Sequence, residues 1–215
     1  MASVPTGTTF YVASTIAAAK TTTVVTNASE AVVTCTTHGY SNGDFVMLTS
    51  GWGRLNKRAF RIKSITTDTF VLEGADTSST TLYPAGTGIG TVAKITAWTQ
   101  VTLVTGISTS GGDPKTVSYK YIESDVEYSI NDGFTAASAT LDIDADAIGT
   151  AGYTALKSLT EVQTDTVIKM VKRSGAISLR PCTVALNEDE QMTDGQITKV
   201  KASLNGNNRL TRYAS

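Results

Sequence analysis

The chain has 215 residues, of which 40% are hydrophobic and 17% are charged, and its formal net charge at pH 7 is −1. This length and composition predict a globular protein with a real hydrophobic core, in one large or two small domains. A net charge so close to zero excludes overall electrostatic attraction to nucleic acid or to an anionic membrane, so an electrostatic function would need a local patch.

Cysteine and histidine are scarce in the sequence. Cys35 and Cys182 are too few for a disulfide framework or a structural zinc site, so we expect two reduced and buried residues. His38 is the only histidine, and any nucleophilic triad would have to use it as the base. It lies in a predicted turn, where a polar turn residue is the simpler interpretation. We therefore expect no metal, no cofactor and no enzymatic activity.

The N-terminal segment has neither the basic start nor the continuous apolar run of a secretion signal. No stretch of the chain is apolar for long enough to span a bilayer. The sequence thus predicts a protein made in the cytoplasm, without a membrane partner.

Abundant threonine and the scarcity of helix-favouring blocks predict an all-β fold. The chain opens with predicted strands at residues 9–12 and 22–25. Residues 31–95 then contain short apolar runs separated by Gly, Asn, Ser and Asp. This pattern is typical of a small antiparallel β unit, which we interpret as an insert in the chain.

The inserted unit carries the one basic cluster of the chain, beside Trp52: Arg54, Lys57, Arg58, Arg61 and Lys63. Such a cluster could contact phosphates while the indole stacks on a base. However, Arg61 and Lys63 alternate with Phe60 and Ile62. The solvated outer face of a strand is therefore the better explanation.

A long alternating run at residues 92–104 leads into a segment rich in glycine and serine, 108–114, which predicts an exposed loop. Strands are expected at 116–122 and 135–143. Residues 142–146 alternate Asp with apolar residues like the start of a calcium-binding loop. The glycine and glutamate that such a loop needs are absent, so an acidic strand end is preferred.

One amphipathic helix is expected near residues 151–163, because apolar residues recur every three positions from Tyr153 to Val162. The remaining segments are predicted strands with one acidic polar loop between them: strands at 166–172, 176–186 and 197–204, and the loop at 187–195.

Short motifs follow one another along the chain: Pro5-Thr6-Gly7-Thr8 with Phe10-Tyr11-Val12, His38-Gly39-Tyr40, Ser50-Gly51-Trp52-Gly53-Arg54-Leu55-Asn56, Ala85-Gly86-Thr87-Gly88-Ile89-Gly90, Ala97-Trp98-Thr99-Gln100, Gly111-Gly112-Asp113-Pro114, Gly152-Tyr153-Thr154-Ala155-Leu156-Lys157 and Arg212-Tyr213. In this order they resemble the tail tube proteins, or major tail proteins, of bacteriophages with long non-contractile tails. The resemblance covers nearly the whole chain, and the order is more specific than any single motif.

The resemblance implies an all-β fold with one short flanking α-helix, a β-sandwich or half-barrel. Its body would comprise residues 1–30 and 96–215, with 31–95 as the inserted unit. It also implies a structural virion protein that forms hexameric rings, stacked into a hollow tube, with a tape-measure protein and a tail terminator as partners. Double-stranded DNA would pass through the tube without specific binding.

The resemblance further implies that each subunit gives four strands to a continuous inner barrel. We expect the strands after the helix to supply them, with these candidate residues: Val167, Lys169, Val171, Ile197, Lys199 and Lys201. The flexible segments are candidates for contacts between rings: Gly111, Gly112, Asp113, Glu188, Asp189 and Glu190. Lysines in a DNA conduit should either face away from the bore or be offset by carboxylates, such as Glu190 and Asp194.

Two alternative functions remain at this point. A β-rich carbohydrate-binding or adhesion module of a phage tail would use Trp52 to stack on a sugar face. A hydrolase is disfavoured, because the sequence offers no constellation around a catalytic base.

Overall fold

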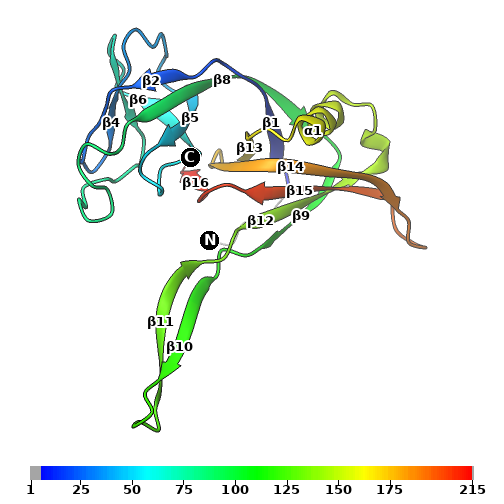
Figure 1. Ribbon diagram of the computed structural model, residues 1–215. Coiled ribbons are helices and arrows are strands. Elements are labelled where there is room, and N and C mark those ends of the chain that lie inside the picture. The colour runs from blue at the N-terminus through cyan, green and yellow to red at the C-terminus, as the bar shows by residue number, and fades with distance from the viewer. Residues whose placement is uncertain (1–5, 215) are drawn as a thin grey trace.

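A curved antiparallel sheet makes up most of the protein (Figure 1). The structure, a computed structural model, describes residues 6–214, so Pro5 of the first motif lies outside the described residues. Fourteen strands form this sheet, and two more form a separate hairpin. The elements are β1 (Thr9–Ile16), β2 (Lys20–Thr22), β3 (Val24–Val25), β4 (Val32–Thr34), β5 (Phe45–Ser50), β6 (Arg58–Lys63), β7 (Thr69–Leu72), β8 (Gly90–Val101), β9 (Val104–Ser110), β10 (Pro114–Lys120), β11 (Glu127–Phe134), β12 (Ser138–Asp144), the 3-10 turn η1 (Ala145–Ala147), α1 (Ala151–Val162), β13 (Thr166–Val171), β14 (Ile177–Gln191), β15 (Lys199–Gly206) and β16 (Thr211–Tyr213).

The order of strands along the sheet is β3-β4-β7-β6-β5-β8-β1-β13-β14-β15-β12-β9, with β2 paired to β8 and β16 paired to β14. Apart from one turn of 3-10 helix, α1 is the only helix of residues 6–214. The predicted all-β half-barrel with one short helix is confirmed. With twelve residues, α1 is also too short to cross a membrane.

Helix α1 begins and ends where its sequence predicts. The side chain of Thr150 accepts a hydrogen bond from the backbone N–H of Tyr153, which caps the N-terminus. Gln163 adopts a left-handed conformation at the C-terminus, with φ of 53°. At Gly152 the helix lies so close to β8 that an added Cβ would be 2.4 Å from the carbonyl oxygen of Gln100. A glycine is therefore required at this contact.

The buried side chains form three clusters. One lies between α1 and one face of the body sheet, and includes Leu141, Leu204 and Leu156. A second cluster fills the small β unit, with Phe60 and Phe70 fully buried. The third joins the two parts and is built of Ala13, Ala59, Ile95, Val167, Leu179 and Tyr213. Strand β8 contributes to all three, so the body and the small unit share one long strand.

The division of the chain into a body and an insert at residues 31–95 stays a prediction. Two short strands that precede the insert in sequence are paired with strands of the insert. Strand β3 pairs with β4, and β2 pairs with the start of β8. Residues 20–25 therefore lie with the small unit in space.

Three segments differ from the sequence prediction. Strand β9 continues to Ser110, and β14 continues through Glu188, Asp189 and Glu190 to Gln191 instead of ending in a loop at residue 187. Strand β9 pairs with β12 up to Ser110. Strand β14 pairs with β15 up to Asn187 and again at Gln191, and the acidic residues 188–190 form an irregularity between these two pairs. Strand β15 begins at Lys199, so Ile197 precedes it.

A hairpin of β10 and β11 extends away from the body (Figure 1). We call residues 114–134 the arm. Sequence analysis predicted its first strand but not its second. All side chains of β10 and β11 are exposed, because the two strands pair only with each other.

The two cysteines and the single histidine of the sequence are buried. Cys35 and Cys182 are free and inaccessible, as predicted. His38 is buried rather than exposed in a turn, and its Nδ1 accepts a hydrogen bond from the backbone N–H of Tyr40 at 3.0 Å. The imidazole also contacts Phe70 edge to face. Both ring nitrogens thus have polar partners within the fold, at the carbonyl oxygen of Thr69 and the backbone N–H of Tyr40.

We expect the body to depend on its core far more than on the arm. Leu141→Ala or Leu204→Ala should lower the free energy of unfolding by about 2–5 kcal/mol, because each leaves a cavity under α1. Val117→Ala in the arm, where the side chain is exposed, should change it by less than about 0.5 kcal/mol. Urea unfolding followed by circular dichroism tests this; equal losses in body and arm would contradict it.

Alkaline pH should destabilise the fold. Burial raises the pKa of Cys182 from 9.0 to about 12 and that of Tyr213 from 10.0 to about 12. Both groups are neutral when protonated, so this stabilisation is complete below the lower, unfolded-state values and is lost as the pH rises towards about 12. Urea titrations between pH 7 and 11 should show a free energy of unfolding that falls above about pH 9. A flat profile over this range would refute the assignment.

Candidate assembly surfaces

Four neighbouring strands, β14, β15, β12 and β9, form a sheet with one apolar and one polar face. We call it the wall sheet. Residues alternate between the two faces of a strand, and one set packs into the core under α1. The opposite set is polar or small: Ser108, Ser110, Ser138, Thr140, Asp142, Asp144, Thr183, Ala185, Asn187, Lys199, Lys201, Ser203 and Asn205.

The charges on the polar face of the wall sheet are balanced. The strand register places Asp142 directly opposite Lys201, and Asp144 directly opposite Lys199. Opposite charges at such positions lie close enough to attract each other. The sequence had suggested Glu190 as an offset for these lysines, but the carboxylates opposite them come from the acidic end of β12.

The wall sheet has a free edge on each side. Strand β9 is the last strand of the sheet and pairs only with β12. On the other side, β13 pairs with β14 only as far as Cys182, so residues 183–191 have no strand neighbour there within the described chain. One backbone N–H of this stretch, that of Leu186, donates to Oγ1 of Thr160 in α1 at 2.8 Å. Free strand edges of this length are templates for pairing with another chain.

The predicted wall residues of β13 lie elsewhere. Val167 is fully buried between the body and the small unit, and Val171 follows it on the same face of β13. Lys169 lies between them in a cage of three rings, with Nζ 4.8 Å from the ring centre of Tyr11 and 4.3 Å from that of Trp98. The third ring is Phe45, at 5.3 Å.

Desolvation in this cage lowers the pKa of Lys169 below its ordinary value, while the ring faces attract the ammonium group. The lysine is therefore held against the small unit by cation–π contacts. The contacts within the subunit therefore already engage the ammonium group of Lys169.

The arm has one apolar and one polar face. Val117 stands opposite Ile130 and Tyr119 stands opposite Tyr128, so all four side chains share a face. The rings of Tyr119 and Tyr128 stack at 5.6 Å, and Tyr121 contacts both. The other face is polar, with pairs such as Ser118 opposite Ser129 and Lys120 opposite Glu127. An apolar face of this kind without a partner marks an interaction surface.

The base of the arm contains the predicted loop residues Gly111, Gly112 and Asp113. Gly111 has φ of 73°, and an added Cβ would lie 1.9 Å from the carbonyl oxygen of Ala136, so only glycine fits. The guanidinium of Arg209 lies over the ring of Phe134 at 4.7 Å and holds the arm from the body side. This contact and the two connecting segments join the arm to the body.

The small β unit does not offer a sugar-stacking surface. Trp52 is only 2% exposed, and its indole N–H lies 2.9 Å from the carbonyl oxygen of Pro84 and 3.0 Å from Oγ1 of Thr87. The basic cluster beside it is largely paired: Lys57 with Asp165, Arg61 with Glu73 and Lys63 with Glu30. The hydrogen bond from Arg61 lowers the pKa of the Glu73 carboxyl. These charges fasten the unit rather than form a phosphate site.

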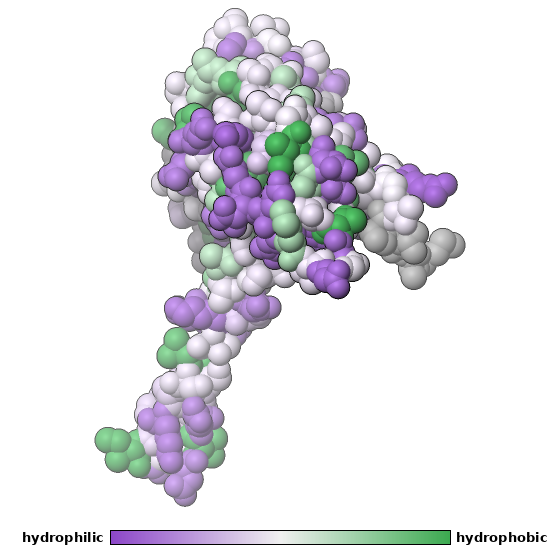
Figure 2. All heavy atoms as spheres, turned by 90° about the vertical axis from the view of Figure 1, so that its right-hand side faces the viewer, coloured by the Kyte–Doolittle hydropathy of each residue, from purple (hydrophilic) through white to green (hydrophobic). Residues whose placement is uncertain are grey.

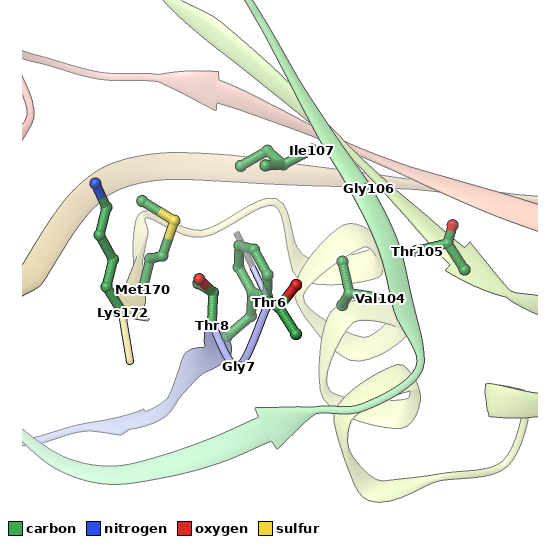
Figure 3. A pocket seen from close by; sticks show the side chains of 10 residues that line it. Thr6, Gly7, Thr8, Val104, Thr105, Gly106, Ile107, Met170 and Lys172 are labelled. Carbon is green, nitrogen blue, oxygen red and sulfur yellow. The ribbon is translucent and has the colours of Figure 1, made fainter. Parts of the chain in front are cut away.

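An open pocket of about 620 Å³ lies beside the free edge of β9 (Figure 3). Figure 3 shows Val104 and Ile107 on one side, with Met170 and Lys172 across from them. Among the residues of 6–214 that line it, Lys172 is the one ionisable side chain, so these residues supply no convergent acid and base groups. It is better understood as an unfilled part of the half-barrel next to an unpaired strand.

The comparisons with known proteins agree with this geometry. A family model described as phage tail tube protein, TTP, matches residues 50–215. The match begins at the last residue of β5 and includes the wall sheet, both of its free edges and the arm. No curated protein matches the chain. The chain therefore belongs to the phage tail tube protein family, whose members are structural components of the virion tail.

Proposed function

We propose that subunits join edge to edge, with β9 of one subunit paired to residues 183–191 of β14 in the next. The two free edges of the wall sheet carry this proposal. Seven residues of β9 span roughly 24 Å, and the nine residues available in β14 span roughly 30 Å, so the edges match in length. Pairing them would remove both free edges of the wall sheet, with the Leu186 N–H exchanging its bond to Thr160 for one to the next subunit.

Six subunits, the number that the family resemblance implies, would bring twenty-four strands into a closed barrel. With strands about 4.8 Å apart and tilted by roughly 45°, the circumference is near 160 Å and the diameter near 50 Å. Side chains of roughly 5 Å on each wall leave a bore near 40 Å. Duplex DNA, about 20 Å wide, passes through such a bore.

The polar face of the wall sheet would line this bore, because the other face is filled by the core under α1. Its hydroxyl and amide groups keep the surface wet, and its two lysines are offset by Asp142 and Asp144. Retention of DNA depends on cations that neutralise phosphates. A charge-balanced wall therefore conducts the genome without binding it.

The rings would stack into the tail tube, built in the host cytoplasm and carried in the virion, with a tape-measure protein inside and a terminator at its end. The arm and its base, including Gly111 to Asp113, are placed to contact the neighbouring ring because they project from one end of the wall sheet (Figure 1).

Proline substitutions in β9 test the edge pairing. Successive backbone N–H groups of a strand point to opposite sides. Of the N–H groups of Ile107 and Ser108, one therefore lies on the free edge and the other bonds to β12. Ile107→Pro and Ser108→Pro each remove one of these two donors. We expect one variant with near-parental stability in urea that forms no rings in electron micrographs, and one that is destabilised. Closed rings from both variants would refute the pairing.

Neutralising the wall carboxylates tests the conduit. Tubes of Asp142→Asn/Asp144→Asn should retain double-stranded DNA at low salt, because the lysines opposite are no longer offset, and should release it as salt increases. Co-sedimentation of labelled duplex with tubes measures this. The control is Asp76→Asn/Glu161→Gln, which makes the same charge change outside the wall sheet and the arm. Equal retention by control and wall variant would place the wall face outside the bore.

A further inference from the structure

A set of exposed apolar side chains lies at one end of the wall sheet. Leu103, Ile148 and Ile197 are 52%, 46% and 51% exposed. Backbone hydrogen bonds bring their segments together, from Asp144 N–H to the Leu103 carbonyl and from Ala145 N–H to the Thr198 carbonyl, each at 3.0 Å. The turn at residues 145–148 then places Ile148 beside them.

Met192, which is 73% exposed, follows the last residue of β14 in the neighbouring hairpin, where Gln191 pairs with Lys199. We call Leu103, Ile148, Met192 and Ile197 the end patch. None of these side chains belongs to a core cluster, so their exposure is not explained by the fold of one subunit.

The arm leaves the wall sheet at the opposite end. Its base adjoins Ser110, Ser138 and Asn205, which are paired across the three strands. The end patch adjoins the other ends of the same strands, at Val104, Asp144 and Lys199. Figure 1 shows the arm leaving β9 and β12 on the side away from the β14–β15 hairpin. Figure 2 shows green hydrophobic atoms near the far end of the arm and others on the body face that carries this hairpin.

We propose that the apolar face of the arm docks on the end patch of a subunit in the adjacent ring, an inference that rests on the proposed stacking of rings. Two different surfaces at opposite ends of one subunit form a head-to-tail contact, which does not close on itself and therefore propagates as an open stack. A symmetric contact between two arms would join two rings and stop there. A second copy of this chain is thus the occupant that fits a tube.

The arm has the reach that this contact needs. Its strand β10 and the wall strand β12 both have seven residues, roughly 24 Å each, so an arm is about as long as the wall sheet is high. An arm that projects past the lower end of one ring therefore overlaps the upper end of the next.

The attraction between the two surfaces is apolar. The tip of the arm carries Glu123 and Asp125, and the hairpin beside the end patch carries Asp189 and Glu190. Two further carboxylates face lysines, because Glu127 lies opposite Lys120 and Glu188 pairs with Lys157. The like charges of the tip and the hairpin repel at low ionic strength and are screened at higher salt. Stacking of preformed rings should therefore increase with salt concentration, whereas stacking driven by opposite charges would decrease.

Substitutions in the end patch test the docking. Leu103→Asp/Ile197→Asp should leave single rings intact but reduce the yield of stacked tubes at least tenfold in electron micrographs. Val162→Asp on α1, where the parent side chain is 65% exposed and lies outside the patch, should stack normally. Normal tubes from the patch variant would overturn the docking while the ring proposal stands. A parent protein that forms neither rings nor tubes would overturn both.

Cross-linking identifies the contact directly. One population carries Val117→Cys or Tyr121→Cys in the arm, the other carries Ile197→Cys, and the two are mixed before assembly. The native cysteines are buried and do not compete. Oxidised tubes should contain disulfide-linked pairs made of one arm variant and one patch variant. Arm-to-arm pairs alone, or tubes with no mixed pair from either arm position, would overturn the proposal.

Discussion

A sheet that does not close into a barrel leaves unpaired backbone groups along its edges. The wall sheet of this protein has such edges at β9 and at residues 183–191 of β14. A single subunit cannot pair these two edges with each other, because β15 and β12 lie between β14 and β9 in the sheet. The remaining way to satisfy both rows is to pair them with each other in another copy. In the proposed ring, assembly would therefore complete the pairing of the sheet.

Because side chains alternate along the wall strands, the same sheet has one face in the apolar core and one polar face. Leu141 and Ile143 enter the core, whereas Asp142 and Asp144, between and after them, face the opposite way. Because the period of a strand is two, a slip of one residue in β12 would exchange apolar and charged side chains. The register therefore fixes both the core under α1 and the balance of charge on the polar face.

The sequence predicts the parts of this fold whose signals are local. The apolar spacing and the cap at Thr150 define α1, and alternation defines most strands. It could not predict the extension of β14 to Gln191, because the strand resumes its pairing with β15 only at Gln191 and Lys199, after an irregularity at residues 188–190, and such a pair is a long-range property. Nor could it show that Asp144 meets Lys199, since their register is a long-range property.

The second strand of the arm was missed for a related reason. Asn131-Asp132-Gly133 resembles a turn, although Tyr128 and Ile130 alternate with polar residues as a strand requires. The difference between local and long-range signals also explains why the sequence suggests Val167 and Lys169 as wall residues. Their alternation identifies β13 correctly, but only the contacts of the small unit show which neighbour each face meets.

A tail tube subunit must remain separate until assembly begins, and the arm combines features that allow this. Its apolar face is built largely from tyrosines, whose hydroxyl groups stay hydrated while the rings remain available for contact. Acidic residues at the tip repel other free subunits, so an encounter between two arms is unfavourable. The proposed ring would present several arms to several acceptor sites at once, which would multiply a contact that is weak for one subunit. Ring closure by backbone pairing would thus come first, and stacking through the arms would follow from it.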